Sequence, residues 1–162
     1  MNTRIDEKYW MRLAMDIAKA STCRAEVGCI LVFNKTVVGM GYVGSAHGDD
    51  HCFGEKGEPA ATTKHLLVKT PVRGSTVNGD TCIRTIHAEI NAILKCPWRG
   101  SKELGWIECY STYEPCLDCT KVLIQIGVRK IFYLHNYKDE WREIYLQNVV
   151  VTPALVVLQL RM

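Results

Sequence analysis

The sequence predicts a single α/β domain in which helices cover a mixed β-sheet. Three observations predict this class. A chain of 162 residues suits one hydrophobic core. Two short β-branched runs near the N-terminus have the spacing of an antiparallel hairpin. In the second half, strand and helix patterns alternate, which is typical of parallel pairing. We therefore expect one domain over residues 1–162, with a loop-rich insertion at residues 44–80.

The N-terminal half is predicted to contain one helix and the hairpin. Apolar residues at helical spacing predict a helix over about residues 6–20. The segments VGCILVF (27–33) and TVVGMGY (36–42) are predicted strands, with a turn at Asn34 and Lys35. The insertion at 44–80 lacks periodicity and is expected to be mostly loop, with a short helix near residues 64–69.

The C-terminal half is predicted to alternate helices and strands. Its expected elements are, in order, a helix at 87–95 with Thr85 as N-cap, a strand at 106–112, a helix from Pro115 to Gly127, a strand at 130–134, a helix at 139–147 and one or two strands from 149 onward. Parallel strands with helical connections predict that helices cover the sheet.

Composition restricts the compartment and the partners. Hydrophobic residues make up 48% and charged residues 23% of the chain, values that are ordinary for a soluble protein. A net charge of +3 favours an anionic substrate but does not indicate a nucleic-acid-binding surface. We see no signal peptide and no apolar run of membrane length, so we expect a cytoplasmic protein without a membrane partner. Eight cysteines in a reducing compartment favour metal binding or catalysis over disulfides.

Two short motifs carry the chemistry. His87 and Glu89 are followed, further along the chain, by Cys116 and Cys119 after Pro115. The pattern H-x-E…P-C-x-x-C is a known signature of zinc nucleobase deaminases. Catalytic zinc takes three protein ligands and leaves its fourth position to water. Cysteines three apart at a helix start can face the same point, and a helix N-terminus favours the ligating thiolate. The sequence therefore predicts a catalytic zinc held by His87, Cys116 and Cys119.

Glu89 is the predicted proton carrier rather than a fourth ligand. Residues two apart do not share a helix flank, so His87 and Glu89 serve one site only if it lies off the helix end. We expect Glu89 to take a proton from zinc-bound water, pass it to N3 of a cytosine ring and protonate the departing amino group. Taken alone, HAE is also typical of a helix start, and Cys-x-x-Cys is also typical of a redox pair or half of a structural zinc site.

The sequence resembles the deoxycytidylate (dCMP) deaminase family from about Ser21 to Asp139. The resemblance is carried by STC (21–23), VGC (27–29), GYVGS (41–45), DHC (50–52), CIRTIHAEINAIL (82–94) and EPCLDC (114–119). It implies a cytidine-deaminase-like three-layer α/β/α fold with a central, mostly five-stranded mixed sheet. It also implies conversion of dCMP to dUMP for thymidylate synthesis by a homo-oligomer, often a hexamer. In the family, dCTP with Mg²⁺ activates the enzyme and dTTP inhibits it.

Two positions depart from the family pattern. Val43 stands where the family has the Asn of Gly-Tyr-Asn-Gly, and a valine side chain cannot hydrogen-bond the nucleotide. Either Ser45 or His47 takes over that contact, or the substrate differs. Glu114 before Pro115 looks more like the tRNA adenosine deaminases. The candidate substrate-binding residues are Tyr42, Val43, Ser45, Ala88 and Tyr137, with Arg84, Lys95 and Arg99 as candidate phosphate contacts.

The resemblance also implies a second, structural zinc. Its candidate ligands are Cys23, His51, Cys52 and Cys82, which flank the hairpin and the insertion. The alternative is that Cys23 and Cys82 are small buried apolar residues, as free cysteines commonly are. Three further cysteines are expected to fill the core, namely Cys29, Cys96 and Cys109.

Two other functions remain open at this point. A tRNA adenosine deaminase shares both motifs, but it would carry a more basic face for RNA and would not need the Cys/His-bearing insertion. Free-cytidine deaminases usually have Cys where His87 stands, and riboflavin-pathway deaminases space their cysteines more widely. A non-catalytic, zinc-stabilised nucleotide-binding module is the alternative from another class. Glu89 argues against it, because a structural zinc needs no proton carrier.

Overall fold

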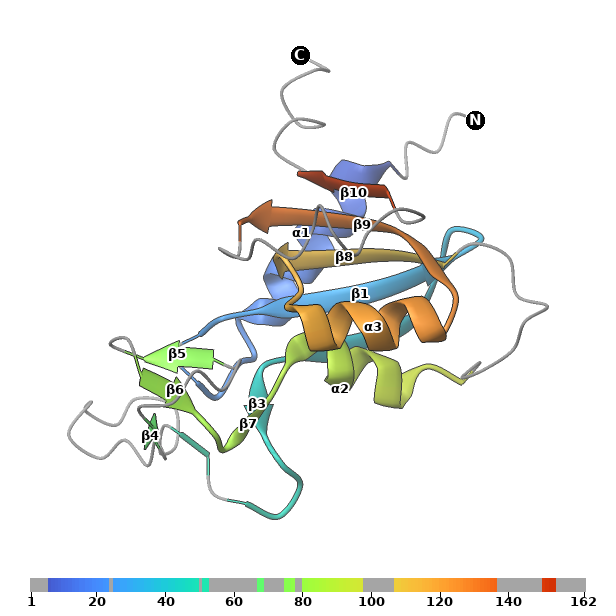
Figure 1. Ribbon diagram of the computed structural model, residues 1–162. Coiled ribbons are helices and arrows are strands. Elements are labelled where there is room, and N and C mark those ends of the chain that lie inside the picture. Colours follow the sequence, from blue (N-terminus) through green and yellow to red (C-terminus); the bar gives the residue numbers. More distant parts are fainter. Residues whose placement is uncertain are drawn as a thin grey trace.

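The centre of the fold is a five-stranded mixed sheet with strand order β10-β9-β8-β1-β2 (Figure 1). The structure is a computed structural model, and it describes residues 6–23, 25–49, 51–52, 67–68, 75–77, 80–97, 107–136 and 150–153. The elements are α1 (Glu7–Ala18), β1 (Gly28–Phe33), β2 (Thr36–Tyr42), β3 (Gly44–Ser45), β4 (Leu67–Val68), β5 (Ser75–Val77), β6 (Asp80–Cys82), β7 (Thr85–Ile86), α2 (Ala88–Lys95), β8 (Ile107–Tyr113), α3 (Leu117–Gln125), β9 (Val128–His135) and β10 (Val150–Pro153).

The pairing of the main sheet follows the sequence pattern. Strands β1 and β2 form the predicted antiparallel hairpin, with Asn34 and Lys35 at φ values of 47° and 58° in its turn. Strand β8 pairs antiparallel with β1, whereas β9 is parallel to β8, and β10 is parallel to β9. The parallel pairing predicted for the second half is thus confirmed. Because β8 and β9 end at the same edge of the sheet, the residues that follow β8 lie at that edge.

Helices cover both faces of the sheet. Helix α1 lies on one face, and α2 and α3 lie on the other (Figure 1). A Cβ at Gly28 would clash with the Ala14 carbonyl of α1, and a Cβ at Gly41 would clash with the Ala88 carbonyl of α2. Both close approaches therefore require glycine. The predicted three-layer α/β/α fold with five strands in its central sheet is confirmed.

Alternating side chains divide the core into two clusters. Ile30 and Tyr110 pack with Trp10 and Met11 on the α1 side of the sheet. Leu31 packs on the other side, beneath α2 and α3. That second cluster also contains Cys29, Cys96 and Cys109, which fill the core as predicted.

Two small sheets lie beyond the end of the main sheet toward which β8 and β9 run (Figure 1). One is three-stranded with the order β4-β6-β5, and the other joins β3 to β7. The pairing of Gly44 with Ile86 brings the segment after the hairpin next to His87. Within the described residues, no helix has the length and apolarity of a membrane span.

Three local predictions are wrong. Leu67 and Val68 form a strand rather than a helix, because they pair with β6 and pairing outweighs local propensity. Thr85 lies in β7, and the N-cap of α2 is His87. Helix α3 begins at Leu117, so Pro115 precedes its N-cap, where the fixed φ of proline suits extended backbone. The predicted strand after residue 149 is confirmed as β10, and the predicted helix at 139–147 lies outside the described residues.

Candidate metal centre and active site

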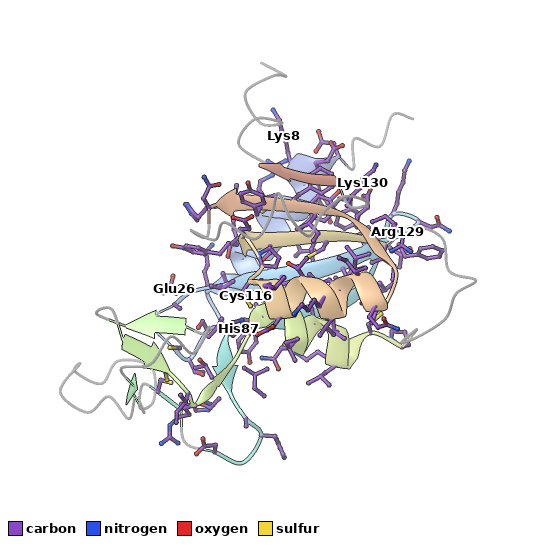
Figure 2. The ribbon with its side chains drawn as sticks, viewed as in Figure 1. Lys8, Glu26, His87, Cys116, Arg129 and Lys130 are labelled. Carbon is purple, nitrogen blue, oxygen red and sulfur yellow. The ribbon has the colours of Figure 1, made fainter. Side chains whose placement is uncertain are left out.

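Three predicted ligands converge at the ends of α2 and α3. Nδ1 of His87 lies 3.2 Å from Sγ of Cys119 and 3.6 Å from Sγ of Cys116, and the three ligand atoms all lie within 4.8 Å of one another. Figure 2 shows His87 and Cys116 at the neighbouring ends of the two helices. Zinc bonds of about 2.0–2.3 Å in tetrahedral geometry place their ligand atoms about 3.5–3.8 Å apart. The three side chains therefore fit a zinc ion with little rearrangement.

Helix ends position these ligands. His87 is the N-cap of α2 and Cys116 is the N-cap of α3, while Cys119 lies in the first turn of α3. N-cap residues have extended backbone, so their side chains project beyond the helix end. Neither side chain caps its own helix, which leaves the ring nitrogen and the sulfur available to a metal. The positive ends of two helix dipoles meet here and favour thiolate ligands.

Hydrogen bonding between the two cysteines shifts their pKa values in opposite directions. The pKa of Cys116 is lowered to about 4, first because Cys119 donates a hydrogen bond to its thiolate; burial opposes this, and His87 adds a second hydrogen bond. The same hydrogen bond, followed by burial, raises the pKa of Cys119. The hydrogen bond to Cys116 also raises the pKa of His87. A metal must therefore displace protons from this site, so its affinity falls as the pH falls.

Glu89 lies beside the three ligands in the first turn of α2, and only 4% of its surface is exposed. Burial is the main cause that raises the pKa of its carboxyl group, and the neighbouring His87 opposes this shift. Its Oε1 accepts a hydrogen bond of 3.0 Å from the hydroxyl of Ser111, which is fully buried on β8. A buried carboxyl with a raised pKa next to a metal triad is suited to carrying protons.

Sequence reasoning missed Ser111 and also Asn91. Ser111 is a polar residue on a strand that is otherwise mostly buried, and this was the only signal that could have singled it out. Nδ2 of Asn91 donates a 2.8 Å hydrogen bond to the Tyr42 carbonyl and a longer one to the Ile86 carbonyl. Asn91 thus ties the end of β2 to the residue that precedes His87.

The predicted substrate-binding residues have varied surroundings. The Tyr42 ring lies 5.6 Å from the Lys95 ammonium. Val43 is buried and its carbonyl accepts a hydrogen bond from Ser21, while the buried hydroxyl of Ser45 has no hydrogen-bond partner among the residues that the structure describes. Ala88 is fully buried at the start of α2, whereas His47 is exposed. Arg84 forms an ion pair with Asp49. Tyr137 and Arg99 lie outside the described residues.

A second cluster of sulfur atoms lies near the small sheets. The Sγ atoms of Cys23, Cys52 and Cys82 lie within 4.8 Å of one another, with 3.6 Å between those of Cys52 and Cys82. All three side chains are buried, whereas His51 is exposed and is not part of the group. Burial is the main cause that raises the pKa of Cys52. We call Cys23, Cys52 and Cys82 the three-sulfur cluster.

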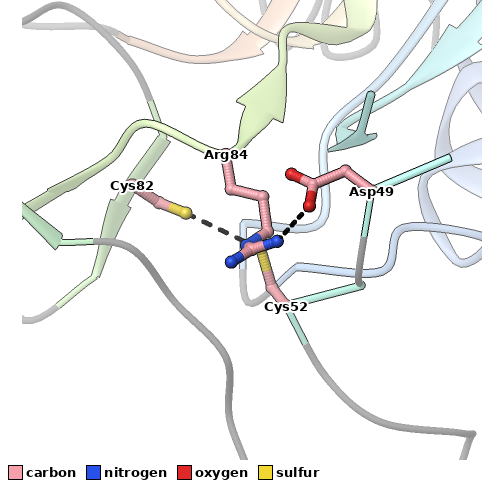
Figure 3. Close-up of polar contacts among 4 residues, drawn as sticks. All are labelled: Asp49, Cys52, Cys82 and Arg84. Atoms are coloured by element: carbon pink, nitrogen blue, oxygen red, sulfur yellow. Dashed lines mark hydrogen bonds and ion pairs between the residues drawn. The ribbon is translucent and has the colours of Figure 1, made fainter. Parts of the chain in front are cut away.

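An ion pair between a largely buried arginine and an exposed aspartate lies next to the three-sulfur cluster. Figure 3 shows the Arg84 guanidinium between Asp49, with which it pairs, and the sulfur atoms of Cys52 and Cys82. Only 10% of the Arg84 side-chain surface is exposed. The guanidinium thus places a positive charge beside the three-sulfur cluster.

The sequence matches one protein family over most of its length. Residues 4–135 match the family described as cytidine and deoxycytidylate deaminase zinc-binding region. The chain is 36% identical over 132 residues to ComE operon protein 2 of Bacillus subtilis, and 32% identical over 133 residues to the deoxycytidylate deaminase of Schizosaccharomyces pombe. These matches cover 81% of this chain in each case, but only 60% and 37% of the two relatives. A deoxycytidylate deaminase of Mycobacterium phage D29 is 28% identical, over 78% of this chain and 92% of its own.

Solved structures share the fold. The dCMP deaminase of cyanophage S-TIM5 in complex with dCMP and dUMP matches with a TM-score of 0.64 and 27% identity, covering 94% of this chain and 98% of its own. Its apo form matches with a TM-score of 0.61 and 25% identity, over 93% of this chain and 98% of its own. A structure from a study of tRNA:A34 deaminases matches with a TM-score of 0.53 and 19% identity, covering 92% of this chain and 94% of its own, and shares the fold alone.

Proposed function

Because this chain belongs to the cytidine and deoxycytidylate deaminase zinc-binding family, we propose that it hydrolyses dCMP to dUMP and ammonia. The observation that carries the proposal is the group of His87, Cys116 and Cys119, with the buried Glu89 carboxyl beside it. The cyanophage relative, bound to dCMP and dUMP, supports a pyrimidine nucleotide as substrate.

The proposed mechanism divides the work between the metal and the protein. A zinc ion held by His87, Cys116 and Cys119 would lower the pKa of a bound water and so supply a nucleophile at neutral pH. Glu89 takes a proton from the attacking water as its oxygen adds to C4, and delivers that proton to ring N3. Glu89 then takes the remaining proton of the added hydroxyl and gives it to the amino group, which leaves as ammonia. Ser111 holds Oε1 of Glu89 in place, and burial of the carboxyl excludes competing water.

The substitution Glu89→Gln tests this mechanism most directly. The amide keeps the size of the side chain but cannot carry protons, so we expect zinc to stay bound while turnover of dCMP falls about 10³-fold or more. Zinc content is measured by metal analysis, and turnover by loss of cytosine absorbance and release of ammonia. Glu26→Gln, which changes an exposed glutamate, is the matched control and should keep wild-type turnover. Normal turnover by Glu89→Gln would refute the role of this carboxyl.

Substrate choice and regulation follow from the family resemblance. We propose that the protein is a cytoplasmic homo-oligomer, a hexamer. In this proposal dCTP with Mg²⁺ activates the enzyme and dTTP inhibits it. The dUMP that it produces would feed thymidylate synthesis. Because a valine occupies position 43, the assay should compare dCMP with dCTP, cytidine and a tRNA anticodon stem, each with and without added dCTP. Preference for dCMP supports the proposal, and preference for the RNA would favour an adenosine deaminase. Sedimentation measures the size of the oligomer.

A second, structural zinc is also proposed. Three buried sulfur atoms within 4.8 Å of one another support it, and the donor set suits zinc better than a hard cation. His51 stays the proposed fourth ligand, because structural zinc takes four ligands; its side chain is exposed and lies outside the three-sulfur cluster, so it would have to turn toward the metal. We expect metal analysis to find two zinc ions per chain, and one zinc ion per chain would contradict the second site.

A further inference from the structure

An exposed aromatic residue ends the strand that carries Ser111. Along β8, alternate side chains point to opposite faces of the sheet. Cys109 lies in the core beneath α2 and α3, and Ser111 contacts Glu89 of α2, so Tyr113 belongs to the same face. Tyr113 is 41% exposed, whereas every other residue of β8 is buried or half-buried. An aromatic ring is thus left open at the end of β8, on the face that bears the proposed active site.

The position of Tyr113 along the strand places it within reach of a nucleotide. Two residues of a strand span about 7 Å, so Tyr113 lies about that far beyond Ser111. It also comes three residues before the proposed ligand Cys116. In α/β sheets, ligands bind outside the carboxyl ends of the parallel strands, and β8 ends here beside β9. The strand spacing therefore puts this ring within a nucleotide's length of Glu89.

One flank of the Tyr113 ring is already covered. His135 is its register partner on β9, and the two ring centroids are 4.8 Å apart at an interplanar angle of 41°. A 2.8 Å hydrogen bond from the Glu114 N–H to the His135 carbonyl fixes the two strand ends. In the strand order β9-β8-β1, His135 lies on one side of Tyr113, and β1, with α2 packed on it, lies on the other. The side of the ring opposite His135 is thus the side toward Glu89 of α2, whereas α3, which carries Cys116 and Cys119, packs on β9.

We infer that Tyr113 is a specificity-determining residue that packs its ring against the base and deoxyribose of the substrate, with His135 as the positioning residue that holds the ring. The inference rests on the proposed function and adds a contact for the nucleoside part of the substrate. Tyrosine rings commonly combine an apolar contact surface with a polar tip, which suits a base and a sugar. A packing contact of this kind with the Tyr113 ring does not require a hydrogen bond from position 43, where this chain has valine.

The affinity for the product distinguishes a Tyr113 ring that contacts the nucleoside from one that only faces solvent. Zinc-loaded protein is titrated with dUMP and with deoxyuridine, using calorimetry or ligand-observed NMR. We expect Tyr113→Ala to weaken both ligands about tenfold, because base stacking on an aromatic ring is lost. Tyr113→Phe should bind nearly as wild type. The matched control is Tyr9→Ala, which removes a tyrosine of similar exposure, 44%, from α1 on the opposite face and should change neither affinity. Zinc content and the melting temperature are recorded for each variant to verify folding.

A double-mutant cycle tests the role of His135. His135→Ala should weaken binding by less than Tyr113→Ala does, and it should add nothing when Tyr113 is already alanine. Additive losses would overturn the positioning role. Wild-type affinity in Tyr113→Ala, or a loss confined to dUMP, would overturn the nucleoside contact. If the wild-type protein itself binds neither ligand and does not turn over dCMP, the proposed function fails before this inference is reached.

Discussion

The two sulfur clusters of this chain use similar atoms in different surroundings. His87, Cys116 and Cys119 lie where two helix N-termini meet, and a buried carboxyl is beside them. The three-sulfur cluster comes from loops and β6, and it has the guanidinium of Arg84 beside it instead of a proton carrier. Chemistry on a substrate needs an open ligand position and a group that exchanges protons, whereas a structural site needs only closure. The neighbours of each cluster, more than its sulfur atoms, therefore indicate its use.

Charge separates the two clusters as well. A zinc ion with two thiolates and a neutral imidazole carries no net charge, whereas a zinc ion with three thiolates carries one negative charge. Arg84, whose guanidinium lies beside Cys52 and Cys82, has the sign that compensates this charge. At the active site, a permanent cation at the same depth would instead lower the pKa of the Glu89 carboxyl group and make it a poorer proton donor.

The largest expected effect comes from removing an active-site ligand. Cys119→Ser should lose the catalytic zinc and lower turnover of dCMP by more than about 10³-fold, because water activation and metal geometry both fail. The second zinc should stay bound, so metal analysis should fall from two ions per chain to one. Loss of both ions would instead show that the two clusters do not bind metal independently.

The next largest effect concerns stability. Cys52→Ser should lose the structural zinc and lower the free energy of unfolding by about 4 kcal/mol or more, since loss of a metal is among the most destabilising single changes. At a temperature where the variant is still folded, its turnover per bound catalytic zinc should match the wild type. Thermal melting and metal analysis measure these two effects. Unchanged melting together with two bound ions would contradict a metal at the three-sulfur cluster.

The sequence predicted some parts of these sites because their signals are local. His87, Glu89, Cys116 and Cys119 have a fixed spacing at helix starts, and the helix and strand periods around them are strong. Ser111 could not be found in this way, because its contact with Glu89 joins residues that are 22 positions apart and depends on the register of β8. The Arg84–Asp49 pair spans 35 positions for the same reason. Strands as short as β4 exist only through pairing, so no local pattern distinguishes them from loop.

A moderate loss of turnover is expected for Ser111→Ala, which removes the side chain that contacts Glu89. Removing the hydrogen bond to the Glu89 carboxylate should lower turnover about tenfold while zinc stays bound. That bond lowers the pKa of Glu89 against the effect of burial, so its loss raises the pKa further. The carboxylate is the active form, and activity is lost as the pH falls through this pKa. The acid limb of the profile of kcat/KM against pH should therefore move to higher pH, and an unmoved limb would argue against this role of Ser111.

The smallest effect is expected at Arg84. Arg84→Met keeps most of the side-chain volume but removes the charge beside the three-sulfur cluster, so the affinity of that cluster for zinc should fall about tenfold. Competition with a chelator measures this, and turnover at saturating zinc should not change. Arg129→Met is the matched control, because Arg129 is exposed on β9, far along the chain from the three-sulfur cluster. If both variants release zinc like the wild type, the guanidinium does not balance a negative metal centre. The Arg84–Asp49 pair would then serve only to join the link between β6 and β7 to the loop after β3.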